Sequence, residues 1–308
     1  MKAFVFSAVV LVVSALSLLP VSARAGTISL GTAAPYAVIA ETLVSNPTTF
    51  GDTVITGGVA VSPSGACTGF MPAACGGASA GTISGAIHIN DTPAADALAD
   101  AGTAELALLA TVIPAPVDLT GHVLGSPGYT SLAPGIYTFT SSAQLTGTLT
   151  LAAGADLDPV WIFEIATTLT TATDASVNVT DTTGGAGIAG AGVYWVEETG
   201  QAILGNNTAF LGNIFAGTNI TFYPGAQDTC GRAFADTSVT FGGDNPAQQG
   251  GQPNIVSDTC AQSASGFNGP TPGAGGGTPE PGTLVLLSSG LLAMVLLAFR
   301  KSRVSPLI

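Results

Sequence analysis

Few side chains in this sequence could perform catalysis. Two carboxylate pairs and two histidines are present: Asp156/Asp158, Glu197/Glu198, His88 and His122. Sites that cleave polysaccharides need acids beside Arg, Lys or His, and neither pair has a basic neighbour in the sequence. Adjacent strand residues also point to opposite faces. No Ser-His-Asp or Cys-His arrangement is credible, so we predict a protein that is not an enzyme and needs no cofactor.

The four cysteines predict disulfides rather than a metal centre. They are Cys67, Cys75, Cys230 and Cys260, without a C-x-x-C spacing, and the two histidines are not placed to complete a zinc site. Four cysteines allow three pairings. Proximity in the sequence favours Cys67 with Cys75 and Cys230 with Cys260.

The charge distribution excludes one class of partner. Across residues 26 to 278 the only basic side chain is Arg232, against eighteen acidic ones. Such a segment repels phosphate backbones and cannot release counterions from them, so nucleic acid is not a partner. No Asp-rich loop of the calcium-binding type accompanies the acids.

An internal repeat indicates the architecture. Residues 212 to 222 match residues 231 to 241 at six of eleven positions, at an offset of 19 residues. A period near 20 with alternating apolar residues is typical of stacked β-coils. The offset predicts a column of Thr199, Thr218 and Thr237, with Ser141 and Thr167 before it. It also predicts a companion column of Thr170, Thr221 and Thr240. Either column could face solvent or the interior, because Thr also stacks inside such folds.

One helix should interrupt the strands, from about residue 93 to 112. Asn90 to Pro93 supplies capping signals, and Pro114 ends the pattern. Apolar residues at helical spacing predict a stripe along the coil wall: Leu98, Gly102, Leu106, Leu109 and Ile113.

The two ends predict export and a membrane segment. Residues 1 to 25 have the pattern of a signal peptide, and residues 26 to 260 form the β domain. A Gly/Pro/Ser linker follows at 261 to 278. In the tail, 279 to 308, the apolar run 283 to 299 predicts a transmembrane helix.

The tail resembles the Pro-Glu-Pro C-terminal sorting signal (PEP-CTERM). The motif, the apolar run and the basic cluster occur in order: Pro279, Glu280, Pro281, then Arg300, Lys301 and Arg303. The resemblance implies processing by an exosortase-type enzyme after transient anchoring in the inner membrane. The mature protein would then reach the cell surface or the extracellular matrix.

The body resembles the microbial ice-binding family. The blocks that carry the resemblance include residues 30–40, 58–63, 85–88, 132–137, 145–151, 161–165 and 211–214. The family implies a mainly β fold, a right-handed, discontinuous β-solenoid of triangular type with one long helix packed alongside. It also implies adsorption to the surface of an ice crystal.

Many members of that family carry Thr-(Ala/Gly)-x-(Thr/Asn) on the ice-binding face, and no stretch here satisfies this pattern. The nearest positions define the first candidate face: Thr171, Thr173, Asn206, Asn207, Thr208 and Gln227. The column Thr199, Thr218 and Thr237 is the second candidate. A face that includes Asp174 and Pro224 is irregular, so weak ice activity is expected. The alternative is an adhesion protein that binds exopolysaccharide in the matrix and has no ice activity.

Overall fold

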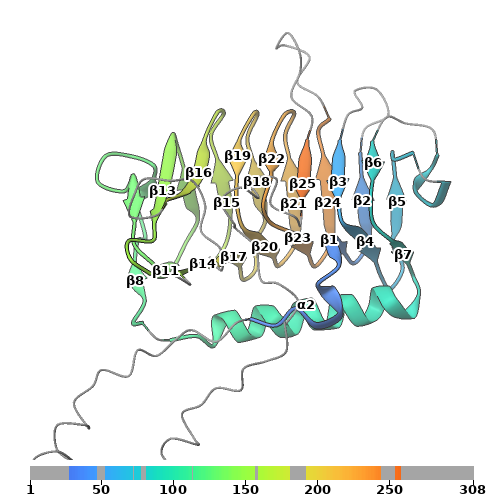
Figure 1. Cartoon of the computed structure of the whole chain (residues 1–308), viewed down its shortest axis with the longest axis horizontal. Coiled ribbons are helices and arrows are strands. Elements are labelled where there is room, and N and C mark those ends of the chain that lie inside the picture. The colour runs from blue at the N-terminus through green and yellow to red at the C-terminus, as the bar shows by residue number, and fades with distance from the viewer. Residues whose placement is uncertain are drawn as a thin grey trace, which may run out of the picture. The chain divides into compact units, whose positions relative to one another are not determined.

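The structure is a computed structural model that describes residues 28–46, 53–71, 73–77, 81–112, 114–156, 159–180, 192–243 and 254–257. The predicted signal peptide, linker and sorting signal lie outside these residues. The strands form three sheets, and within each sheet they are parallel (Figure 1). Successive strands of the chain belong to different sheets, except for the two strands that an α-helix connects.

Sheet A has nine strands. In spatial order they are β7 (Ile87–Ile89), β4 (Gly58–Val61), β1 (Tyr36–Ala40), β23 (Ala233–Ala235), β20 (Asn213–Ala216), β17 (Gly192–Glu197), β14 (Val160–Ile165), β11 (Gly135–Phe139) and β8 (Val117–Asp118).

Sheet B has eight strands. In spatial order they are β5 (Ala66–Thr68), β2 (Leu43–Ser45), β24 (Ser238–Phe241), β21 (Asn219–Phe222), β18 (Ala202–Leu204), β15 (Leu169–Thr171), β12 (Ala143–Leu145) and β9 (Val123–Leu124).

Sheet C also has eight strands. Their order is β10 (Ser131–Leu132), β13 (Thr148–Ala152), β16 (Ser176–Thr180), β19 (Ala209–Phe210), β22 (Gln227–Asp228), β25 (Ile255–Ser257), β3 (Val54–Thr56) and β6 (Thr82–Ile83). Two short 3-10 helices, η1 (Gly31–Ala33) and η2 (Ala73–Cys75), lie outside the sheets.

The stacking order is discontinuous in sequence. The first strand, β1, pairs with β23 near the end of the domain, where Val38 lies opposite Ala233. The side chain of Arg232 crosses this junction, because its Nη2 donates a hydrogen bond to the carbonyl oxygen of Ala34 at 3.1 Å. The N-terminal strands therefore extend the same stack beyond its C-terminal end, and residues almost 200 positions apart become neighbours.

The repeat of 19 residues is a true structural register. Phe215 lies opposite Phe234 in sheet A, and Thr221 lies opposite Thr240 in sheet B. Val196 and Phe215 keep the same offset between β17 and β20. Beyond the corner it shortens to 18 residues, since Ala202 pairs with Ile220.

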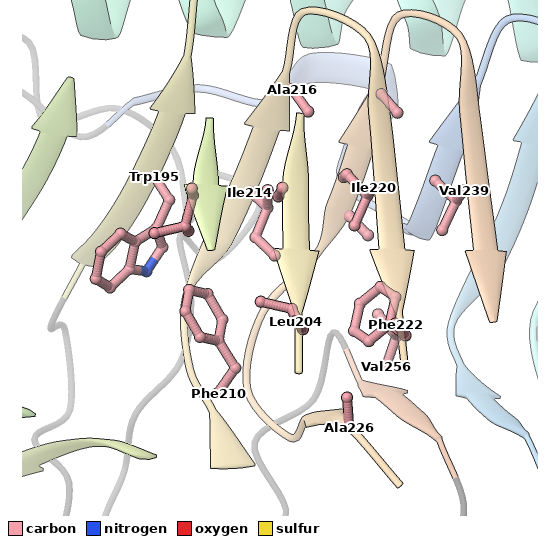
Figure 2. Packing of buried hydrophobic residues seen from close by; sticks show 14 of the residues in the cluster. Trp195, Leu204, Phe210, Ile214, Ala216, Ile220, Phe222, Ala226, Val239 and Val256 are labelled. Atoms are coloured by element: carbon pink, nitrogen blue, oxygen red, sulfur yellow. The ribbon is translucent and has the colours of Figure 1, made fainter. Parts of the chain in front are cut away.

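The interior is filled by residues that alternate inward from all three sheets (Figure 2). Phe163 stacks on Trp195 with ring centroids 3.9 Å apart, and Phe210 lies 4.9 Å beyond the indole. Close packing of these rings forces the coils into register, since a shifted coil would leave a void. The rigid core therefore fixes the positions of the outward side chains.

Among the described residues one α-helix, α2 (Thr92–Leu109), is present, and it covers the outer face of sheet A (Figure 1). The predicted stripe is confirmed in part: Leu98 and Leu109 are partly buried and pack against the helix–sheet cluster, but Leu106 is 70% exposed. The buried residues of the helix are Ala94, Ala97, Ala101, Ala104 and Leu108. Alanines allow close approach to a sheet face that already carries large side chains such as Tyr194, Phe215 and Phe234. Among the described residues, no helix is both long and apolar enough to cross a membrane.

The disulfide Cys67–Cys75 closes a loop at the β5 end of the stack, with a sequence separation of 8 residues. This is the pairing that sequence proximity favours. Cys230 is also disulfide-bonded, and its predicted partner, Cys260, lies outside the described residues.

Candidate functional site

Helix α2 decides which surfaces can meet a large ligand. It packs on the outward residues of sheet A, among them Ile39, Ile162 and Val196, which are buried. The outer faces of sheets B and C have no such cover in the part of the chain that the structure describes. A planar ligand therefore has access to these two faces.

One end of sheet B presents a row of hydroxyls on four neighbouring strands. Thr221 pairs with Thr240, Thr240 with Ser45, and Ser45 with Thr68. We call these four residues the central row. Their strand neighbours Val44, Ile220, Val239 and Phe241 are fully or almost fully buried, so the central-row side chains point outward.

The central row continues along sheet B with less regular chemistry. Thr221 pairs with Ile203, which pairs with Thr170, and Thr170 pairs with Gln144. The predicted companion column of Thr170, Thr221 and Thr240 therefore lies in one row, with Ile203 inserted. Ser45 and Thr68 were missed, because no sequence period connects the N-terminal strands to the repeat.

A second row lies beside the central row on the same strands. Asn219 pairs with Ser238, and Ser238 with Leu43. The Ser238 hydroxyl donates to the Asn219 side-chain oxygen at 2.8 Å, and the Ser45 hydroxyl donates to that of Thr240 at 3.4 Å. No residue of the eight sheet B strands is charged.

The threonine column predicted as the second candidate lies at the corner between sheets A and B. The Thr237 amide donates to the carbonyl of Thr218, so these two are in register. Thr199 is one residue out of register, because the Thr218 amide donates to the Gly200 carbonyl instead. The hydroxyls of Thr199 and Thr218 both donate to backbone carbonyls, at 2.8 Å each.

The first predicted face does not form one surface. Thr171 and Thr208 are buried, and their hydroxyl oxygens are 2.7 Å apart inside the corner between sheets B and C. Their hydroxyls satisfy polar groups of the turn, since Thr171 also accepts from the Gly205 amide at 2.8 Å. Neither residue is available to a ligand at the surface.

The other members of that predicted face are divided between the corner and sheet C. Thr173 is exposed, and Asn206 and Asn207 are partly exposed in the turn. The Asn207 amide nitrogen donates to the Asp174 carboxylate at 3.1 Å, so a charge lies beside them. Gln227 lies on the outer face of sheet C, opposite Ala209 and Ile255.

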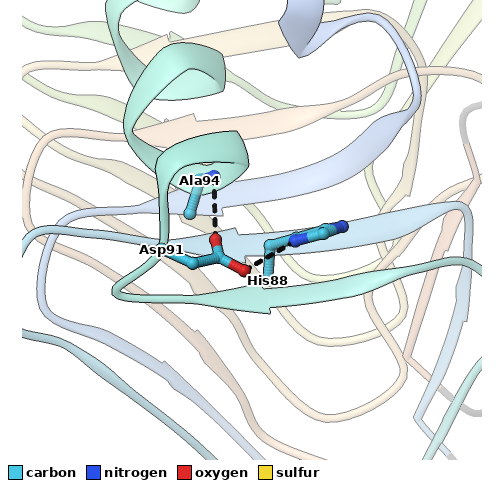
Figure 3. Close-up of polar contacts among 3 residues, drawn as sticks. All are labelled: His88, Asp91 and Ala94. Carbon is cyan, nitrogen blue, oxygen red and sulfur yellow. Dashed lines mark hydrogen bonds and ion pairs between the residues drawn. The ribbon is translucent and has the colours of Figure 1, made fainter.

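His88 has a structural partner. Its Nδ1 lies 2.8 Å from a carboxylate oxygen of Asp91, and the other carboxylate oxygen of Asp91 accepts from the Ala94 amide at the start of α2 (Figure 3). The hydrogen bond from His88 and that from the Ala94 amide lower the pKa of Asp91. The pair therefore caps the helix.

The acid pair Glu197 and Glu198 is divided by the sheet. Glu197 is fully buried without a hydrogen-bond partner for either carboxylate oxygen, whereas Glu198 is exposed. Burial, with a smaller contribution from the nearby Glu105 carboxylate, raises the pKa of Glu197 well above its usual value. Asp156 is described but Asp158 is not. No group of three His, Cys, Asp or Glu residues suited to a metal occurs among the described residues.

A narrow groove between α2 and sheet A contains further acids. Glu105 and Asp236 line it together with Phe215 and Phe234. Burial, and then the charges of Asp236 and Glu198, raise the pKa of Glu105 to about 7. These carboxylates have no nucleophile or cation beside them in the described structure, so the groove has the character of a packing defect between helix and sheet.

The fold and the outer faces define a class of protein that binds through an ordered array of side chains on parallel strands. Comparison with known proteins makes the class specific: residues 38–245 match the ice-binding-like family, and the chain belongs to that family.

Named relatives agree over most of the chain. An ice-binding protein of Nostoc sp. (strain HG1) is 37% identical over 297 residues, covering 96% of this chain and 95% of the relative. Ice-binding protein K3-B1 of Typhula ishikariensis is 35% identical, covering 68% of this chain and 86% of its own. The crystal structure of an ice-binding protein from Antarctomyces psychrotrophicus has a TM-score of 0.60 at 30% identity, covering 76% of this chain and 98% of that one.

Proposed function

We propose that this protein adsorbs to ice through the outer face of sheet B. The observation that carries the proposal is the central row, in which Thr221, Thr240, Ser45 and Thr68 stand in register on an uncharged, uncovered face. The protein is then a binding protein, and its ligand is a water lattice rather than a molecule held in a pocket.

The geometry of the central row suits an ordered solid. Parallel strands place equivalent residues about 4.8 Å apart across the sheet, and alternate residues about 6.6 Å apart along a strand. Threonine is stiff at χ1, and the packed core has already fixed the backbone, so little conformational entropy remains to be lost on binding. Each hydroxyl binds weakly, but the whole row acts together.

The chemistry of the corners also favours sheet B over the A–B corner. Glu198 and Asp236 lie beside Thr199 and Thr237, and charged groups hold liquid water strongly. Because the hydroxyls of Thr199 and Thr218 already donate to carbonyls, they have less hydrogen-bonding capacity for an ice lattice. The sequence from residue 26 to 278 has no lysine.

The test is a charge placed in the middle of the central row. Thr221→Lys and Thr240→Lys should strongly reduce ice shaping and inhibition of recrystallisation, while the fold survives because both side chains point outward. Thr103→Lys is the matched control, since Thr103 is exposed on α2. Full activity in a folded double variant, or an inactive wild-type protein, contradicts the proposal.

We infer further that the three-sheet stack is a right-handed, discontinuous β-solenoid. The stacked parallel strands and the β1–β23 junction support this inference, as does the general right-handedness of parallel crossovers.

The sequence of both ends supports export, transient membrane anchoring and exosortase-type processing to the cell surface or matrix. Mass spectrometry of the protein from its native cells tests this inference. A mature chain that retains residues 1 to 25 or the tail after Pro281 contradicts it.

A further inference from the structure

Sheet C carries a second ordered hydroxyl array, on a different face and at the other end of the stack. We define the sheet C patch by its outward residues on β10, β13 and β16: Ser131, Thr148, Thr150, Ser176, Asn178 and Thr180. The alternating residues Leu149, Leu151, Val177 and Val179 are buried in the interior cluster, so the patch faces outward.

The patch has the regular spacing of the sheet. Thr148 pairs with Ser176, and Thr150 pairs with both Asn178 and Ser131. The hydroxyls of Thr148 and Ser176 lie 2.8 Å apart, which shows that neighbouring side chains share hydrogen bonds along the row. The result is a two-dimensional array with the spacings of the central row, about 4.8 Å by about 6.6 Å.

The position of the patch separates it from the central row. The central row lies on β21, β24, β2 and β5, at one end of sheet B, whereas β10, β13 and β16 form the opposite end of sheet C. Figure 1 shows β13 and β16 at the green end of the stack and β2 and β5 at the blue end. One ice plane cannot contact both arrays in the same way, because they belong to different sheets.

The chemistry of the patch favours ice over a polysaccharide. The three strands contain no charged residue and no aromatic residue. Sugar-binding sites are concave and use aromatic or apolar walls, which an array of short hydroxyl and amide side chains does not provide. Short side chains, of which the three threonines are stiff at χ1, instead hold surface water in fixed positions.

We propose that the sheet C patch is a second ice-adsorbing surface, so that one molecule can adsorb to ice in two orientations. This inference rests on the proposed function of the protein. It predicts that blocking the central row reduces adsorption without abolishing it, and that the remaining adsorption requires the patch.

The experiment measures the fraction of the full-length chain taken up by a slowly grown ice shell. The central row is blocked by Thr221→Lys with Thr240→Lys, the patch by Thr150→Lys with Asn178→Lys, and both by the four changes together. Thr103→Lys serves as the control. Thermal unfolding followed by circular dichroism verifies that each variant is folded.

We expect the central-row variant to retain an uptake clearly above that of a non-binding protein, and the fourfold variant to fall to that level. Uptake at the non-binding level in the central-row variant overturns the second surface and leaves the proposed function intact. Absence of uptake in the wild-type protein overturns both. Retention on an uncharged dextran resin that the patch substitutions remove, without any effect on ice uptake, assigns the patch to a polysaccharide and also overturns the inference.

Discussion

Glu197 provides a prediction that depends only on the interior of the fold. Its carboxyl group is fully buried between Ile165 and Ala216 on the neighbouring strands, and neither oxygen has a hydrogen-bond partner among the described residues. Burial raises its pKa well above the usual value, so the folded protein keeps the proton when the unfolded chain has lost it. Stability therefore falls as the pH rises through the interval between the unfolded and the folded pKa.

The magnitude follows from linkage. Within that interval the folded state binds one more proton at this site than the unfolded state, which lowers the free energy of unfolding by about 1.4 kcal/mol per pH unit. Glu197→Gln removes the titration but keeps the shape. Between pH 5 and pH 6 the variant should therefore gain about 1.4 kcal/mol relative to the wild-type protein.

The assay is urea unfolding at constant ionic strength, followed by circular dichroism at several pH values. Burial also raises the pKa of Glu105 and of Asp228, but both groups are present in both proteins, so their contributions cancel in the difference to first order. Asp96→Asn, at an exposed carboxylate on α2, is the matched control. Parallel stability profiles for the wild-type protein and Glu197→Gln would show that the buried carboxyl does not hold its proton and would refute the reasoning.

Three further changes test the helix cap, the core and the disulfide. Asp91→Ala should lower Tm and weaken the docking of α2, because it removes the helix cap. The difference in Tm from the wild-type protein should vanish as the pH falls through the lowered pKa of Asp91, since the wild-type cap is then protonated. Asp96→Ala, at an exposed position of the same helix, is the control. Trp195→Ala should cost about 3 to 5 kcal/mol in urea unfolding, because the indole fills the interior against Phe163. Replacement of both Cys67 and Cys75 by serine, which leaves the disulfide of Cys230 intact, should cost about 2.5 kcal/mol, the loop-closure entropy of an eight-residue loop.

A specific result would contradict each of these three predictions. An Asp91→Ala variant as stable as Asp96→Ala at neutral pH would show that the cap does not contribute. A loss below 1 kcal/mol for Trp195→Ala would mean that the core closes around the gap. If the variant with Cys67→Ser and Cys75→Ser has the same urea midpoint as the oxidised wild-type protein, the loop is held by other contacts.

Much of the architecture could be predicted from local patterns. The 19-residue repeat predicted the register between β20 and β23 and between β21 and β24, because identical coils must present identical side chains to each other. Capping residues around Asp91 predicted where α2 begins. Both are short-range features, and the residues that cause them are close together in the sequence.

The face of the helix could be predicted only in part from its leucines. Large residues of sheet A occupy the space at the interface, so mostly alanines and Leu108 face the sheet, and Leu106 does not. In the same way, the direction of Thr171 and Thr208 depended on the turn, whose buried polar groups needed hydroxyl partners. The periodicity of a sequence alone does not show which side chains of neighbouring elements fill the space around a residue.

The sequence by itself determined that this chain is a lightly charged stack of β-strands with hydroxyl residues in columns. Only the tertiary structure decided which columns face outward. Ser45 and Thr68 join Thr221 and Thr240 because β1 and β2 stack on the last coils, 195 residues away along the chain between Ser45 and Thr240. Pairing over such a distance depends on the closed stack of three sheets, and no local pattern encodes it.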